Sequence, residues 1–261
     1  MTTGRHAEWR LSTVEFDVLW REFGRGLPPY PLDLPSPGTT YGERAQVVAE
    51  IWAQLASRGV VDAGPRRRLP ADIDDALSVL AKGRVIIDGI IDLGEQVYLL
   101  AAKDGVRAAL VMQREDDIRL LATMDAALLS GRLVELLPSF PPAHGQPVSL
   151  PYQLLIDVLG KLAGGEIDSA EFEQLLRVAG LSGRDVRWIA GLAQGDQSHA
   201  VQFGVNVEGN RVGVLSWYAT EQGGVLVTRQ KAPDGDWVTI TPSDPERVIA
   251  RLDELAGSRR G

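Results

Sequence analysis

The chain contains one stretch of sequence twice, and this duplication limits the folds it can adopt. When the sequence is shifted by 119 positions without a gap, residues 98–137 fall on residues 217–256. Two repeats of this length are too few for a solenoid, which needs three or more. The duplication therefore predicts one body with pseudo-two-fold symmetry. The matched landmarks are Gly105-Val106 with Gly224-Val225 at a turn, Asp117 with Asp236, Asp125 with Asp244, and the Arg-Leu-x-Glu-Leu of residues 132–136 with that of residues 251–255.

The first half is predicted to form a short strand, three helices, four strands and a closing helix. The strand covers residues 9–11, and the helices begin at the capping boxes Ser12/Glu15 and Thr40/Glu43 and at Pro70. The proline-rich residues 27–38 are predicted to be an extended connection. From residue 85 the apolar period changes to two, which indicates antiparallel strands. We expect these strands near residues 85–87, 96–100, 108–112 and 118–121, and the closing helix over residues 125–137.

The second half repeats this order of helices, strands and helix. Helices are predicted over residues 152–162 and from caps at Asp168 and Ser182, and a last helix from Asp244. Strands are predicted over residues 200–207, 212–219, 225–230 and 237–241. The fold class is therefore α+β with a mainly antiparallel sheet. We expect one domain made of two halves, residues 1–137 and 152–261, joined by a proline-rich linker over residues 138–151.

Composition argues against several functional classes. The formal net charge of −8 opposes binding to nucleic acid or anionic membranes, and the basic runs at residues 66–68 and 259–260 do not alternate with aromatic residues. The absence of cysteine excludes disulfides, thiolate metal sites and cysteine nucleophiles. The first ten residues lack an apolar segment, and no run of 18 apolar residues occurs, so we expect a cytosolic, soluble protein without membrane insertion.

The sequence does not contain a recognisable catalytic or metal-binding motif. His6, His144 and His199 are too widely separated to form a metal site, and no cofactor is predicted. Ser198 and His199 are adjacent, so on a strand they point to opposite faces, and a nucleophile elbow is absent. We therefore predict that the chain is not an enzyme.

Polar side chains alternate along the strands of the second half and mark one face of the sheet. An ordinary solvent-facing sheet surface shows the same pattern, and Trp188, Trp217 and Trp237 are expected in the core. The alternative interpretation is a binding face with hydrogen-bonding groups around apolar positions. The residues concerned are Gln202, Asn206, Ser216, Tyr218, Arg229 and Lys231.

Two blocks of sequence, one near each end of the chain, carry residue patterns that are found together in a known protein family. The C-terminal block comprises residues 226–230, residues 233–242 with Asp234-Gly235-Asp236-Trp237, and the Arg-Leu-x-Glu-Leu of residues 251–255. The N-terminal block comprises Leu11-Ser12 with Glu15, Phe16 and Leu19, then residues 27–29 and 55–61. Together the two blocks resemble the EspG family, the secretion-associated proteins of actinobacterial type VII (ESX) systems. The resemblance spans nearly the whole chain and preserves order and length.

The resemblance implies a cytosolic actinobacterial chaperone without enzymatic activity, in which helical bundles flank the central sheet. Such a protein binds the helical tip of a PE/PPE-type (or WXG-like) heterodimer over an interface of about 1,600 Å². By position, the contact surface is the C-terminal half of the sheet together with the loop at residues 92–96. The partner-binding residues expected there are Leu93, Glu95, Gln202, Asn206, Ser216, Tyr218 and Arg229.

Two other functions remain open from the sequence. One is a ligand-binding or hydrolytic enzyme, which a deep polar pocket holding His199 and a carboxylate would favour. The other is a structural subunit that dimerises through the edge of its sheet. For the chaperone we expect a monomer or a weak homodimer when no partner is bound.

Overall fold

A computed structural model describes residues 8–257 except 63, 65–67, 140, 196 and 234. His6, Arg66, Arg67, Asp234 and the basic run at residues 259–260 lie outside the described residues. The first half consists of β1 (Glu8–Ser12), α1 (Thr13–Glu22), α2 (Tyr41–Ser57), α3 (Ala71–Lys82), β2 (Val85–Asp92), β3 (Gln96–Asp104), β4 (Arg107–Arg114), β5 (Asp117–Asp125), a 3-10 turn (Ala126–Leu128) and α4 (Leu129–Val134). The second half consists of β6 (Val148–Pro151), α5 (Tyr152–Ala163), α6 (Ser169–Val178), α7 (Gly183–Gln194), β7 (Gln197–Val207), β8 (Asn210–Thr220), β9 (Gly223–Ala232), β10 (Gly235–Pro242) and α8 (Pro245–Gly257).

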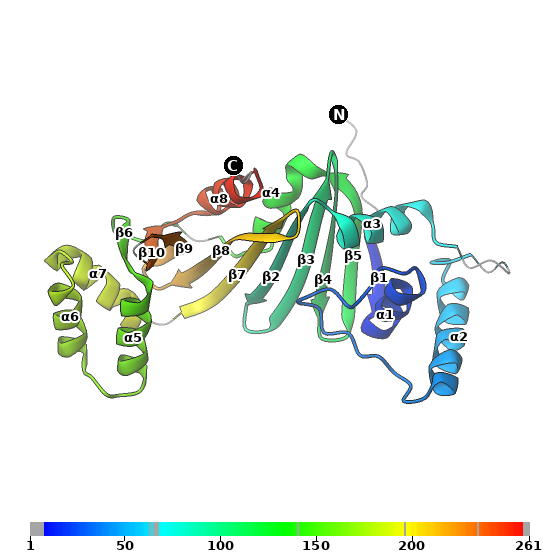
Figure 1. The fold of residues 1–261 in the computed structure, drawn as a ribbon, viewed down its shortest axis with the longest axis horizontal. Coiled ribbons are helices and arrows are strands. Elements are labelled where there is room, and N and C mark those ends of the chain that lie inside the picture. The colour runs from blue at the N-terminus through cyan, green and yellow to red at the C-terminus, as the bar shows by residue number, and fades with distance from the viewer. Residues whose placement is uncertain are drawn as a thin grey trace.

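The described strands form one ten-stranded sheet, in which the two halves arrange their strands in the same way from opposite edges (Figure 1). The order is β1-β5-β4-β3-β2-β7-β8-β9-β10-β6, so each half places its first strand at an edge and its second strand at the centre. The halves meet where β2 and β7 pair antiparallel, with Asp88 opposite Gly204. This order confirms the α+β class and the pseudo-two-fold arrangement.

The ungapped repeat alignment is right for the closing helices and wrong for the turn between β3 and β4. Leu133 of α4 and Leu252 of α8 are both fully buried in one core, as the alignment predicts. The turn that corresponds to Gly105-Val106 lies at Glu221 and Gln222, because β9 is longer than β4. Gly224 instead lies within β9, where a Cβ atom would come within 2.3 Å of the Ser243 carbonyl oxygen. Glycine is needed at this position for close packing rather than for a turn.

Two further boundaries differ from the sequence prediction. The last four residues of the predicted linker form β6, which pairs with β10 as β1 pairs with β5. The helix predicted over residues 125–137 begins at the Asp125 cap but ends at Val134. A short edge strand has too few residues to show a clear alternation of apolar and polar side chains. Whether it forms therefore depends on its packing against the adjacent strand. We propose that the two halves constitute one domain.

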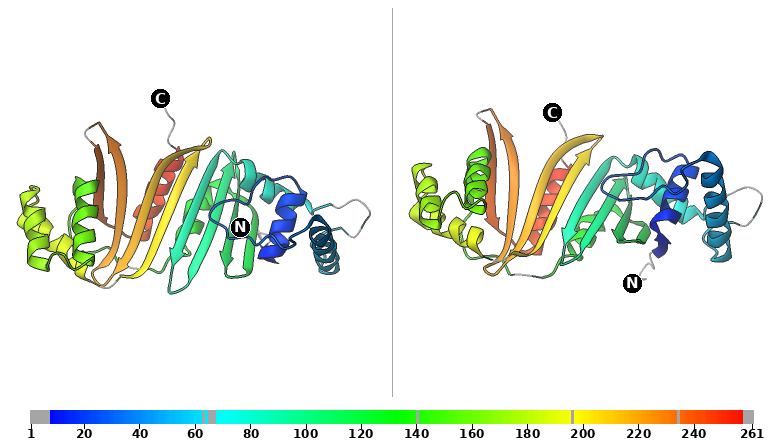
Figure 2. Two further views of the ribbon diagram at one scale, coloured as in Figure 1. Left: turned by 60° about the horizontal axis from the view of Figure 1, so that its bottom comes forward. Right: turned by 90° about the horizontal axis from the view of Figure 1, so that it is seen from below.

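Three helical layers leave the centre of one sheet face bare. Helices α1–α3 cover β3–β5 at one end, and α5–α7 cover β6, β9 and β10 at the other. Helices α4 and α8 pack side by side on the opposite face, where the Ser130 hydroxyl lies 2.6 Å from an Asp253 oxygen. Figure 2 looks onto the first face, where β2, β7 and β8 lie between the two helical ends and none of the described helices covers them. Trp188 and Trp217 are buried as expected, whereas Trp237 is half-buried.

Among the helices of the described residues, none has both the length and the apolar character that crossing a bilayer requires. The predicted capping boxes at Ser12/Glu15 and Thr40/Glu43 form, and Asp168 and Glu171 make a third.

Candidate functional site

A groove of about 500 Å³ lies where the bare centre of the sheet meets the helices of the second half. Strands β7–β10 form its floor, and α5 and the end of α7 form its wall. The apolar wall residues are Leu155, Ile156, Leu159, Ile189, Leu192 and Ala193. The apolar floor residues are Val214, Val225, Val227, Val238 and Ile240. Ile156 and Val214 are 45% and 37% exposed, so this surface offers apolar contact to a partner.

The groove brings together four of the seven residues expected to bind a partner. Gln202 of β7 lies directly opposite Ser216 of β8 in the sheet, and Tyr218 is two positions further along the same face of β8. Arg229 of β9 also lines the groove. The alternation of polar residues along these strands thus marks the sheet face on which the floor lies.

Arg229 is held in place by two contacts. Its Nε donates a hydrogen bond to Asp236 Oδ2 at 2.8 Å, and its guanidinium carbon lies 3.9 Å from the centre of the Tyr152 ring. The ion pair compensates its charge, and the stacking places its planar group against the α5 wall. Among the described residues that line the groove, Arg229 alone carries a formal charge.

Asn206 lies outside the groove, although it is on the same face of β7. Its side chain donates a hydrogen bond to Asp88 Oδ2 at 3.0 Å. Arg211 donates a hydrogen bond to Asp88 Oδ1 at 3.1 Å and forms an ion pair with Asp88 Oδ2 at 2.8 Å. Asp88 belongs to the first half and its two partners to the second. Asn206 therefore helps to join the halves at the seam.

Leu93 and Glu95 also lie away from the groove, in the loop between β2 and β3. Leu93 packs against the core on the side of α4 and α8, and Glu95 makes an exposed ion pair with Arg114 of β4 at 3.4 Å. Lys231 lies beyond Arg229 on β9 and is exposed.

The helical wall was not predicted from the sequence. A signal for it was present in α5, whose apolar residues Leu154, Leu155, Ile156, Val158 and Leu159 cover more of the helix than one buried face requires. Such an excess indicates that the helix has a second apolar surface, which here forms the wall of the groove.

A family model supplies the identification. The model of the EspG family matches residues 12–254, which is nearly the whole chain. The chain belongs to the EspG family. No curated protein sequence matched it in a sequence search.

A solved structure supports the same fold for this EspG-family chain. The structure is that of the Mycobacterium tuberculosis type VII secretion system chaperone EspG5 in complex with a PE25-PPE41 dimer. The two chains are 14% identical, with a TM-score of 0.67, and the match covers 95% of each. At this identity the likeness establishes the fold and leaves the binding partner to be argued from the groove.

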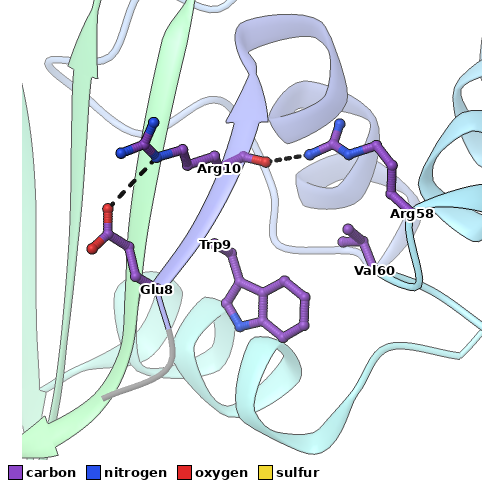
Figure 3. A pocket seen from close by; sticks show the side chains of 5 residues that line it. All are labelled: Glu8, Trp9, Arg10, Arg58 and Val60. Carbon is purple, nitrogen blue, oxygen red and sulfur yellow. Dashed lines mark hydrogen bonds and ion pairs between the residues drawn. The ribbon is translucent and has the colours of Figure 1, made fainter. Parts of the chain in front are cut away.

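A second hollow lies beside β1, at one edge of the sheet in this EspG-family chain (Figure 3). Glu8, Trp9, Arg10, Arg58 and Val60 line it, and its polar groups already contact one another. Arg58 donates to the backbone carbonyl of Arg10, and the Trp9 indole donates to Asp72 Oδ2 at 3.2 Å. Arg58 thereby covers part of the free edge of β1, which reduces the scope for pairing with another chain.

The groove of this EspG-family chain differs from a hydrolytic pocket. Histidine and carboxylate side chains are missing from its described lining, and His199 is not part of it. In the described part of the chain, no three His, Asp or Glu residues are grouped in a way that would hold a metal ion.

Proposed function

We propose that this EspG-family chain is a chaperone and adaptor of a type VII (ESX) secretion system. It binds the helical tip of a PE/PPE-type or WXG-like heterodimer, keeps that substrate soluble and directs it to the secretion machine. The observation that carries the proposal is the largely apolar groove between the bare sheet centre and α5–α7. Membership of the EspG family and the fold shared with EspG5, whose structure holds a PE25-PPE41 dimer, support it.

The groove has the chemistry that a helical tip requires. An amphipathic helix binds by placing apolar side chains into an apolar groove, while a few polar groups of the groove fix its orientation. Here Ile156 and Val214 offer apolar contact, and Gln202, Ser216 and Tyr218 offer hydrogen bonds. A partner whose apolar tip is covered in this way has less surface available for aggregation.

We place this activity in the cytoplasm and assign no catalysis to the chain. The apolar lining of the groove and the position of His199 outside it favour a binding protein over the hydrolytic alternative. A single charged lining residue that is already paired with Asp236 does not provide an acid, a base or a nucleophile.

Co-expression tests the proposal directly. The PE/PPE-type or WXG-like pair encoded nearest to the gene of this chain is expressed with and without it, and the products are separated by size-exclusion chromatography with light scattering. We expect a 1:1:1 complex and an insoluble or aggregated pair when the chain is omitted. A pair that is soluble alone and elutes separately from the chain contradicts the proposal.

A further inference from the structure

A small polar pocket continues the groove across the centre of the sheet. It has a volume of about 100 Å³ and is lined by Tyr30, Asp88, Arg211, Gln202 and Val214, among others. Gln202 and Val214 also line the groove, so the two hollows share a border. Tyr30 comes from the first half of the chain, whereas the groove is built from the second.

The segment that carries Tyr30 is fixed to the protein on both sides of this residue. On one side the indole of the buried Trp20 donates to the Leu27 carbonyl at 2.9 Å. On the other side Leu32 is buried, and the Gln113 amide pairs with the backbone of Asp33 through two hydrogen bonds of 2.8 Å.

Tyr30 is nevertheless 65% exposed. An aromatic side chain held out on an anchored segment loses little conformational entropy on binding, which favours its use as a contact residue.

The charges in the pocket are already matched. Asp88 is 8% exposed and accepts hydrogen bonds from Arg211 and Asn206. Gly204 leaves the space for this ion pair, since a Cβ atom there would lie 1.4 Å from Arg211 Nη1. A charged partner group placed here would lose its hydration without gaining a free counter-ion, so the pocket favours a neutral group.

We propose that the partner surface extends from the groove over Gln202 and Val214 to the ring of Tyr30. The occupant is the helical tip of the substrate, and the part of it that reaches Tyr30 is uncharged, either apolar or bearing an amide or hydroxyl group. Tyr30 is thus a specificity-determining residue supplied by the half that does not form the groove. This inference rests on the proposed chaperone function.

The affinity of Y30A for the co-expressed PE/PPE-type or WXG-like pair tests this contact. Tyr41, which is 99% exposed at the start of α2, provides the matched control Y41A. We expect Y30A to bind at least about tenfold more weakly than the wild type, Y41A to bind as the wild type does, and Y30F to retain affinity because the ring makes the contact. Equal affinity of Y30A and Y41A overturns the inference while leaving the chaperone function intact, and a loss in Y30F equal to that in Y30A overturns the assignment to the ring.

A second measurement reports contact independently of affinity. Because the chain has no cysteine, Y30C and Y41C each introduce a single thiol. We expect the bound pair to protect the thiol of Y30C from alkylation and to leave that of Y41C reactive. Equal reactivity of both thiols in the purified complex overturns the inference. A wild-type chain that binds no pair contradicts the proposed function itself, and the inference falls with it.

Discussion

Individual side chains determine how the groove meets its partner, and Tyr218 and Ile156 occupy its floor and wall. We predict that Y218E and I156E each weaken binding of the PE/PPE-type pair by about 2 kcal/mol or more, about thirtyfold in Kd, because each places an unpaired charge in an apolar contact. Isothermal titration or co-purification measures the loss, and circular dichroism checks folding.

Val106, which is 81% exposed in the turn between β3 and β4, gives the control V106E. Retained binding in both groove variants would show that the partner binds elsewhere. Leu93 is less suitable for this purpose, because it packs against the core and its replacement by a charge would also change stability.

Asp17 of α1 is an internal charge with a structural function. Its side chain is inaccessible to solvent and contacts Arg21 at 2.6 Å and Arg44 of α2 at 2.7 Å. We predict that D17A lowers the free energy of unfolding by about 3–5 kcal/mol, since it leaves partly buried arginines without their counter-ion. Urea unfolding measures the change. The control E135A removes an exposed ion pair with Arg132 and should change the free energy of unfolding by about 1 kcal/mol or less. Similar losses in D17A and E135A would contradict the structural function of Asp17.

At the scale of elements, the sequence predicted features that depend on neighbouring residues better than features that depend on contacts between distant segments. The capping boxes lie within four residues and form as expected, because their hydrogen bonds depend on the local chain alone. The alternation of Gln202, Ser216 and Tyr218 likewise predicted that these side chains share one face of the sheet. The turn at Glu221, the strand β6 and the wall of α5 depend on contacts between distant segments, which a periodic pattern does not specify.

The cap of α2 makes stability depend on pH in a defined direction. The hydroxyl and backbone N–H of Thr39, and then the backbone N–H of Thr40, donate to Glu43 and lower its pKa from the ordinary 4.5. Ionised Glu43 therefore stabilises the fold above pH 4.5, and this contribution is lost as the pH falls through the lowered pKa. We predict that a carbon-13 NMR titration of Glu43 gives a midpoint below 4.5, and that T39A moves it upward. A midpoint at 4.5 or above would show that the cap is open in solution.

At the scale of the molecule, the two halves are alike in order and unlike in their connections. Residues 23–40 join α1 to α2 and cross the sheet face of the first half, where Leu32 and Asp33 are held by the core and by Gln113. Residues 164–168 join α5 to α6 and are too few to do the same in the second half. One half is therefore covered by its own chain, and the other remains open.

This asymmetry predicts a single binding site per chain. Light scattering should give 28.3 kDa for the chain alone and that mass plus one PE/PPE-type pair for the complex, at any excess of the pair. The short edge strands β1 and β6, with Arg58 across β1, favour the monomeric state. Two pairs bound to one chain would show that the covered half also binds.

The pairing of β2 with β7 has an evolutionary consequence. Two separate polypeptides, each carrying one copy of the repeat and joined at the same strands, would form a homodimer in which every mutation appears in both subunits. Any segment that covered one groove would cover both. Fusion of the copies into one gene removes this constraint, because each copy then diverges independently, and a long connection can accumulate in one while the other stays short. A homodimer of identical copies could not combine an open groove with a covered counterpart in this way.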